Sequence, residues 1–449
     1  MTTAAAPRPR SSPRPRPALA VPLALVLSFL FCGRATALCG DISGDGYIKV
    51  SDALSVLKAA VFKYDYDAAY DLDAGQGSDG KITVTDALLV LKAAVKIADP
   101  SCAAATETLT VATTASCDFA TGGVGTFALD PPAASSHALG TVSADAVVRT
   151  AAGRVFVLNR YGADNVQELD SDAGMATLWQ CSVGNGSNPH DIVIVSEDLG
   201  YVSLYDSKDL AIIDPSPSSD CSDFVQGTLD LSDYADADGF PEMDQMLLVG
   251  DTLLVVLQRL DRGSMFAPAS NGALVAIDTA TSTVTASLEL SITNPYAETK
   301  GLVYDEATGL VYLAGPGTFF SDLDDGGIEA VAVDGLVSQG VLMNGTALGG
   351  DLTDLVLVGS SRAYAVVAGG DFANSLVEVD LNKGEVSATL ATSDYLFSDI
   401  EMTESGRLWL ADRDCSDPGL RVFSLADNGE TTTAPLYPGL SPFSLTFLD

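Results

Sequence analysis

The chain has 449 residues, of which 23 are basic and 60 acidic, and its formal net charge at pH 7 is −37. Such acidity argues against nucleic acid or an anionic membrane surface as a partner and favours cations. Solubility of an exported protein is the alternative explanation of the same charge. The length indicates two or three domains.

The N-terminal segment has the pattern of a secretory signal. An arginine- and proline-rich start precedes a short apolar run at residues 18–32, and Ala-Thr-Ala follows at 35–37. We therefore expect residues 1–37 to be removed and the mature protein to be secreted or held at the cell surface. No other stretch is long and apolar enough to insert into a membrane.

The cysteines that remain after the apolar run are even in number, which in an exported chain indicates disulfides. They are Cys39, Cys102, Cys117, Cys181, Cys221 and Cys415.

A twelve-residue loop that starts at Asp41 has the spacing of a calcium site. Calcium is a hard cation that takes six to eight oxygen ligands, and alternate side chains on a tight loop can supply them. Glycine at position 6, Gly46, permits the sharp turn, and apolar residues at helical spacing follow the last ligand. The predicted ligands are Asp41, Ser43, Asp45, Tyr47 through its carbonyl, and Asp52.

The same pattern returns 34 residues later, where DALLVLKAAV nearly copies DALSVLKAAV. In this second loop five residues, AGQGS, separate Asp73 from Asp79, where a single residue is normal, so the second site is either bulged or short of ligands. Its predicted ligands are Asp71, Asp73, Asp79, Lys81 through its carbonyl, and Asp86.

This duplication resembles the type I dockerin module, a small α-helical domain of two loop-helix calcium motifs without the entering helix of an EF-hand. The resemblance covers roughly residues 39–102 and implies two Ca²⁺ ions and a cohesin-type protein module as partner. It assigns partner selection to loop positions 10 and 11, which are Val50, Ser51, Val84 and Thr85. The alternative is that calcium only folds the module. We expect the domain to span residues 38–104. A Cys39–Cys102 disulfide would crosslink it and close a loop of about 60 residues.

From residue 105 to 449 the sequence changes to short apolar runs separated by Gly, Asp, Ser and Pro. Four strands recur in each unit of about 40 to 55 residues, a period typical of β-propeller blades. Seven strand-turn-strand units predict seven blades, and the count closes only if the C-terminal strand completes the blade begun by the N-terminal strands. The fold class is therefore mainly β, a seven-bladed propeller preceded by the small helical domain.

Two disulfides are consistent with this ring. Cys117 and Cys415 follow the second strands of neighbouring blades, so a bridge between them would lock the ring where its two ends meet. Cys181 and Cys221 end the outer strands of consecutive blades and are expected to pair likewise.

Acidic residues recur where the chain enters the innermost strand of a blade, the position that rings the channel mouth of a propeller. They could bind a metal, a cationic ligand or a sugar; the alternative is that each caps a turn or faces solvent. The candidate ligand-binding residues are His190, Asp191, Asp244, Lys300, Asp354 and Asp399. Tyr205, Arg262 and other polar residues are expected farther out.

No catalytic motif accompanies these residues: the sequence lacks the H-E-x-x-H, G-x-S-x-G and P-loop patterns. We expect a secreted calcium-binding protein whose small domain docks to a cohesin-like module and whose propeller binds an extracellular ligand, with polysaccharide a candidate. The alternative is an enzyme tethered by the same domain, a hydrolase or lyase acting on polysaccharide or lactone.

Overall fold

The computed structural model describes residues 49–62, 84–94, 109–297, 301–370, 373–394 and 396–448. In the N-terminal part these include two helices, α1 (Val50–Phe62) and α2 (Val84–Ala94), which pack against each other. None of the helices in the described ranges is long and apolar enough to cross a membrane.

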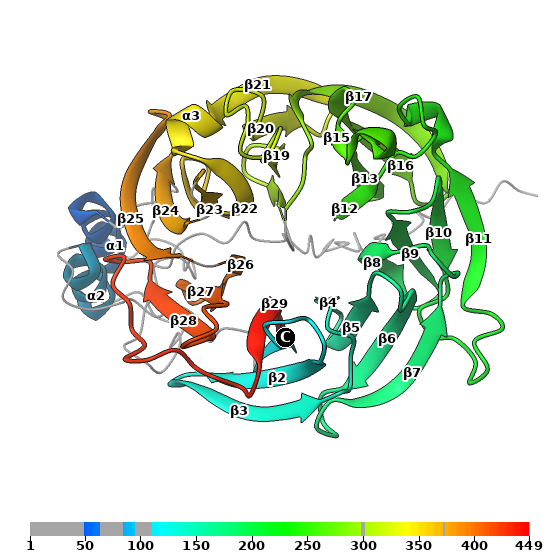
Figure 1. Cartoon of the computed structure of the whole chain (residues 1–449). Helices are drawn as coiled ribbons and strands as arrows, with labels where there is room; N and C mark the ends of the chain where they lie inside the picture. The colour runs from blue at the N-terminus through cyan, green and yellow to red at the C-terminus, as the bar shows by residue number, and fades with distance from the viewer. Residues whose placement is uncertain are drawn as a thin grey trace, which may run out of the picture. The chain divides into compact units, whose positions relative to one another are not determined.

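The remaining described residues form a seven-bladed β-propeller (Figure 1). Each blade is an antiparallel sheet, and in blades 1 to 6 the first of its strands along the chain lies nearest the central axis. Blade 1 contains β4 (Ala146–Ala151), β5 (Arg154–Asn159), β6 (Asn165–Asp170) and β7 (Ala176–Ser182). Blade 2 contains β8 (Pro189–Ser196), β9 (Leu199–Leu204), β10 (Asp209–Ile213) and β11 (Val225–Asp230).

Blades 3 to 5 continue the ring. Blade 3 contains β12 (Met243–Val249), β13 (Thr252–Leu257), β16 (Asn271–Asp278) and β17 (Thr283–Thr293), with a small hairpin of β14 (Leu260–Asp261) and β15 (Ala267–Pro268) inserted. Blade 4 contains β18 (Leu302–Asp305), β19 (Leu310–Gly315), β20 (Gly327–Ala332) and β21 (Val337–Asn344). The short helix α3 (Gly345–Leu348) leads to blade 5, which contains β22 (Asp351–Val358), β23 (Arg362–Ala368), β24 (Asn374–Asp380) and β25 (Glu385–Ser393).

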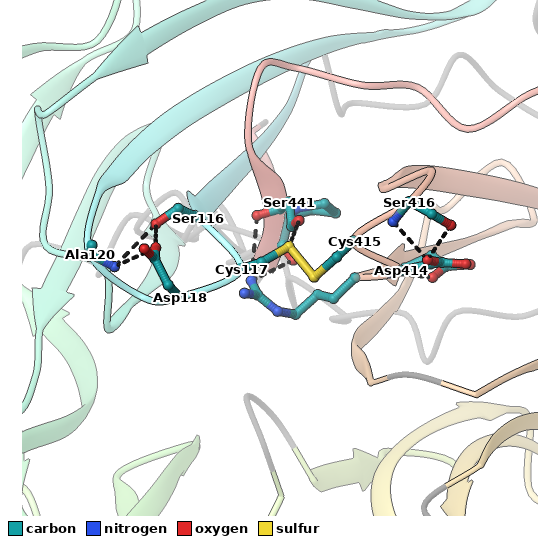
Figure 2. The surroundings of a disulfide bond; sticks show 11 residues. Ser116, Cys117, Asp118, Ala120, Asp414, Cys415, Ser416 and Ser441 are labelled. Atoms are coloured by element: carbon teal, nitrogen blue, oxygen red, sulfur yellow. Dashed lines mark hydrogen bonds between the residues drawn. A yellow bond between two sulfur atoms is a disulfide. The ribbon is translucent and has the colours of Figure 1, made fainter.

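Both ends of the propeller contribute to blade 7, which confirms the predicted closure. The C-terminal strand β29 (Ser441–Leu448) is innermost and pairs with β1 (Leu109–Ala115), followed by β2 (Gly122–Leu129) and β3 (Pro132–Leu139). In Figure 1 the red C-terminal strand lies beside the cyan N-terminal ones. Cys117 and Cys415 form the predicted disulfide between blades 7 and 6 (Figure 2), and Cys181 and Cys221 form the other.

Blade 6 departs from the four-stranded prediction. It has three strands, β26 (Phe397–Met402), β27 (Arg407–Asp412) and β28 (Gly419–Ser424). The expected fourth strand is an irregular segment that bonds to the edge only locally, for example between the backbones of Leu420 and Leu436. Pro435 and Pro438 lack the N–H groups that a regular ladder requires, so this segment covers the edge without extending the sheet.

The apolar core lies between the blades. Each strand alternates its side chains between its two faces, and both faces of a blade are buried against its neighbours. One cluster of buried residues spans blades 1 to 3, and further clusters join blades 3 and 4, 4 and 5, 5 and 6, 6 and 7, and 7 and 1. Since every junction is filled, the blades form a rigid frame that can hold polar residues near the axis.

Candidate functional site

The predicted channel-mouth aspartates are buried and join adjacent blades. Asp191 on β8 accepts the N–H of Ile192 through Oδ1 (2.9 Å) and that of Met246, on β12 of the next blade, through Oδ2 (2.8 Å). Asp354 on β22 likewise accepts the N–H of Leu355 through Oδ1 (2.7 Å) and that of Ile400, on β26 of the next blade, through Oδ2 (2.9 Å).

The same link recurs around much of the ring. Asp399 on β26 accepts the N–H of Leu445 on β29 at 2.6 Å. At the equivalent position of blade 3 the side chain of Gln245 accepts from Gly301, and in blade 7 Ser444 accepts from Val148 at 3.3 Å. At each of these places an innermost strand presents a backbone N–H that its own sheet does not use, in several blades next to a β-bulge. The side chain from the neighbouring blade accepts that N–H.

Burial has an electrostatic consequence for these carboxyl groups. Burial, followed by the nearby carboxylate of Asp399, raises the pKa of Asp354 well above its usual range. Arg149 on β4 donates from Nε to Asp191 Oδ1 at 2.8 Å, so Asp191 also has an arginine partner. The carboxylates of Asp191, Asp354 and Asp399 therefore stabilise blade packing. Lys300, the sixth predicted residue, lies outside the described residues.

The two other predicted residues, His190 and Asp244, meet across the boundary of blades 2 and 3. His190 Nδ1 lies 2.9 Å from Asp244 Oδ1, and Asp244 Oδ2 accepts from Gln258 Nε2 at 2.9 Å. Tyr205 donates its hydroxyl to Gln258 Oε1 at 3.2 Å and stacks on the His190 ring, with centroids 4.3 Å apart. We call these four side chains the His190 network; each one positions the next.

This network leaves one nitrogen of His190 available. An ionised carboxylate only accepts hydrogen bonds, so Nδ1 is the donor to Asp244 and Nε2 carries the lone pair of the neutral ring. Within the described residues no hydrogen bond is made to Nε2, and the side chain is 11% exposed. Burial and the carboxylate of Asp244 raise the pKa of Tyr205, which stays a neutral donor. The site can accept a proton or a hydrogen bond from a hydroxyl-bearing ligand.

Beside this network lies an ion pair between the buried Glu242 and the partly exposed Arg262. Arg262 donates to Glu242 Oε1 and to Asp206 Oδ1, both at 2.8 Å, and its guanidinium lies 4.1 Å from the centre of the Phe240 ring. Glu242 is fully buried and adopts φ +46°, a left-handed conformation that costs a residue with a Cβ free energy. Its other oxygen accepts from the N–H of Leu260 at 3.0 Å.

The Glu242 carboxyl makes a testable contribution to pH-dependent stability. Burial raises its pKa to about 7, even though Arg262 acts in the opposite direction. A raised folded-state pKa stabilises the protein below the unfolded-state value, near 4.5, and this stabilisation is lost as the pH rises through 7. Relative to Glu242→Gln, the wild type should lose about 3 kcal/mol of unfolding free energy between pH 4 and pH 8.

Urea unfolding of both proteins across that range measures this difference. Glu289→Gln removes an exposed carboxyl from the same blade and is the control, for which the difference should stay nearly constant. A pH-independent difference for Glu242→Gln would show that the carboxyl titrates normally.

Of the predicted calcium ligands, only Asp52 has a described side chain. It is buried in the first turn of α1, and its Oδ2 accepts the backbone N–H of Lys49 at 2.7 Å, an arrangement like half of a capping box. Asp86, Ser51, Val84 and Thr85 are described only as backbone of α1 and α2, and Val50 is exposed. The other ligands, together with Cys39 and Cys102, lie outside the described residues: Asp41, Ser43, Asp45, Tyr47, Asp71, Asp73, Asp79 and Lys81. No group of three or more metal-ligating side chains occurs within the described part.

Several residues of the site were not predicted, among them Arg149, Glu242 and Gln258. Gln258 directly follows the apolar strand β13, and Glu242 directly precedes β12. Polar residues at these strand ends were a usable signal, since such ends face the channel mouth. Arg149 lies within a strand, where the sequence offers no comparable marker.

No protein-family model matches the sequence, and no curated protein matches it. Solved structures do resemble the propeller. A putative 6-phosphogluconolactonase from Bacteroides fragilis is 13% identical over 77% of this chain and 99% of its own, with a TM-score of 0.54. A protein from Lactobacillus plantarum is 12% identical over 77% of this chain and 100% of its own, also with a TM-score of 0.54. This likeness shows the fold alone.

Proposed function

We propose that the protein is an extracellular calcium-binding docking protein: its N-terminal domain binds Ca²⁺ and attaches to a cohesin-type module, and its propeller binds a hydroxyl-bearing ligand such as a polysaccharide. Calcium would be held in the first loop by Asp41, Ser43, Asp45, the Tyr47 carbonyl and Asp52. The two disulfides are consistent with an extracellular location.

The observation that carries this proposal is the equivalence of the two helices. Ala53 and Val56 of α1 are buried, as are their counterparts 34 residues later in α2, Ala87 and Val90. Leu54 is 49% exposed and Leu88 48%. Leu57 is 36% exposed and Leu91 37%. A duplicated pair with matched buried and exposed positions supports a domain that presents two similar apolar surfaces, as expected if either half can face a partner.

The His190 network supports ligand binding by the propeller. Its open Nε2 suits a hydroxyl donor, whereas Asp191 and Asp354 use both carboxylate oxygens to accept backbone N–H groups, and Asp399 uses its Oδ2. The same preorganised histidine favours the second candidate function, an enzyme with His190 as general base, because the Asp244 contact fixes its tautomer. A hydrolase or lyase on lactone or polysaccharide remains that alternative.

Calorimetric titration of the secreted full chain with calcium tests the first function. We expect sub-millimolar binding, with loss of the first site in Asp45→Ala/Asp52→Ala, because each replacement removes a carboxylate ligand. Asp198→Ala, an exposed propeller substitution, should bind calcium like the wild type. Absence of binding at millimolar calcium would refute the proposal.

Docking is tested with an immobilised cohesin module in calcium and in EDTA. Replacing Val50 and Ser51, or Val84 and Thr85, by charged residues should change the affinity only a few-fold. Replacing all four should abolish binding, because no intact half remains. If the variant with all four replacements still bound the immobilised module, docking would have to use another surface.

A further inference from the structure

The exposed aromatic side chains of the propeller lie at one end of the ring. Successive strands of a blade are antiparallel, so the loops between second and third strands and the segments that enter an innermost strand share one end. We call this end the channel-mouth face. Among the described residues of the propeller, the exposed phenylalanines and tyrosines, at 39% to 78% exposure, occupy only these loops and segments. They are Phe119, Tyr161, Phe266, Phe319, Phe320 and Tyr437.

The opposite end of the ring differs. Its turns between first and second strands are short, for example Ala152-Gly153, Glu197-Asp198 and Gly250-Asp251. Phe224, in the loop between the third and fourth strands of blade 2, is only 1% exposed. The exposed aromatic rings are therefore concentrated on one face instead of being scattered, which is typical of a binding surface. Exposed aliphatic residues lie instead on the outer strands: Leu139, Leu178, Val225, Val337 and Val341.

In blade 3 the exposure of the aromatic ring is built into the inserted hairpin. Met265 and Phe266 both adopt φ +58°, a conformation that costs bulky residues free energy, and they are 92% and 47% exposed. The turn is held by Asp261, whose carbonyl accepts the N–H of Phe266 at 3.0 Å and whose Oδ2 accepts the hydroxyl of Ser264 at 2.6 Å. The Arg262 guanidinium lies 5.8 Å from the centre of the Phe266 ring. The chain thus holds this ring in an exposed position.

This hairpin adjoins the His190 network. Arg262 donates to the carbonyl oxygen of Tyr205 at 2.9 Å, and its guanidinium lies 6.0 Å from the centre of the Tyr205 ring. Tyr205 in turn stacks on His190 at 4.3 Å. A continuous series of contacts therefore joins the exposed Phe266 ring to the side chain that has an open hydrogen-bond acceptor, His190 Nε2.

Charge restricts the ligands that this face can take. Acidic residues share the loops with the aromatic rings, among them Asp118, Asp261 and Asp322, and the formal net charge of the chain is −37. An anionic polymer would be repelled. Carboxylate oxygens and His190 Nε2 can accept hydrogen bonds from hydroxyl groups. The charge therefore leaves uncharged and cationic ligands.

The placement of the rings favours an extended ligand over a folded protein. The energetically dominant residues of a protein–protein interface cluster near its centre. Here the rings are distributed over the loops of blades 7, 1, 3 and 4 and the segment that enters β29, around a channel mouth whose own residues are polar, such as His190 and Asp244. A long, thin ligand can contact several such rings in turn.

We propose that the channel-mouth face binds an extended, uncharged polysaccharide, whose sugar rings stack on aromatic rings of several blades while its hydroxyl groups bond His190 Nε2. This inference rests on the ligand binding proposed above for the propeller and names the class of ligand. The C–H groups on one face of a pyranose ring carry a small positive partial charge, which complements the negative face of an aromatic ring. The binding does not depend on calcium.

Calorimetric titration of the full chain with cellohexaose, mannohexaose and xylohexaose tests the proposal. At least one should bind saturably, and the disaccharide of the same sugar should bind about tenfold more weakly, because it reaches fewer rings. Tyr161→Ala and Phe266→Ala, in different blades, should each weaken hexasaccharide binding about threefold to tenfold, the effect of losing one aromatic contact. Both side chains are exposed, so the variants should melt near the wild type. Leu178→Ala removes a 56% exposed apolar side chain from the outer strand of blade 1 and should bind like the wild type.

The outcomes separate this inference from the ligand binding on which it rests. If His190→Ala weakens saccharide binding while Tyr161→Ala and Phe266→Ala leave it unchanged, the propeller still binds its ligand and the aromatic face is overturned. Saturable binding of hexagalacturonate as tight as that of the uncharged hexasaccharides would overturn the uncharged class. If none of the three uncharged hexasaccharides binds at millimolar concentration, the proposal fails, and binding of hexalysine in their place would assign the face to a basic protein partner.

Discussion

Replacing both seam cysteines by serine, Cys117→Ser/Cys415→Ser, should lower the unfolding free energy by about 5 to 6 kcal/mol in the chain-entropy estimate. The large effect follows from the sequence separation of 298 residues, because the bridge ties together nearly the whole propeller in the unfolded chain. In the folded state it joins blade 6 to blade 7, the blade that strands from both ends of the propeller complete (Figure 2).

The second disulfide is the matched comparison. Cys181→Ser/Cys221→Ser opens a separation of only 40 residues and should cost about 4 kcal/mol. Denaturant unfolding can be followed by tryptophan fluorescence, since Trp409 is fully buried on β27 beside the seam. An equal or larger loss for the second pair would contradict closure entropy as the main source of stabilisation.

The sequence contained enough information to predict the ring. Strand alternation, regular turn spacing and an even cysteine count are local features, and together they predicted seven blades, the shared blade 7 and both propeller disulfides. The four-stranded prediction for blade 6 was wrong because LRVFSLADNGETTTAPL fits the repeated strand-turn-strand unit, while the prolines in and after its second half prevent a regular ladder.

The candidate site was less predictable, and the aspartates show why. Asp191, Asp244 and Asp354 look alike in sequence, each before an apolar strand. In the structure Asp191 and Asp354 accept N–H groups from the next blade, whereas Asp244 orients His190. Their roles depend on which backbone group the neighbouring blade presents, and that blade lies some 50 residues away in sequence. Asp351 is similar: its contact with the backbone N–H of Phe320 is visible only once blade 4 is placed beside it.

The links between blades lead to the second prediction: Asp354→Ala should destabilise the protein by about 3 to 5 kcal/mol. The substitution leaves two buried N–H groups, those of Leu355 and Ile400, without their acceptor, and both residues are fully buried. Asp354→Asn should cost less, because its single carbonyl oxygen can still serve one of them. The exposed Asp198→Ala should stay within about 0.5 kcal/mol of wild type.

The pH dependence of the unfolding free energy lost in Asp354→Ala distinguishes a buried acceptor between two blades from a charge on the surface. The pKa of Asp354 is raised, so its contribution is fully present below the unfolded value near 4 and declines as the pH rises through the folded value. The cost of Asp354→Ala, measured by urea unfolding, should therefore be larger at pH 5 than at pH 8. A loss below 1 kcal/mol at pH 5 would mean that the two N–H groups find other acceptors, and the carboxylate would again be a candidate for ligand binding.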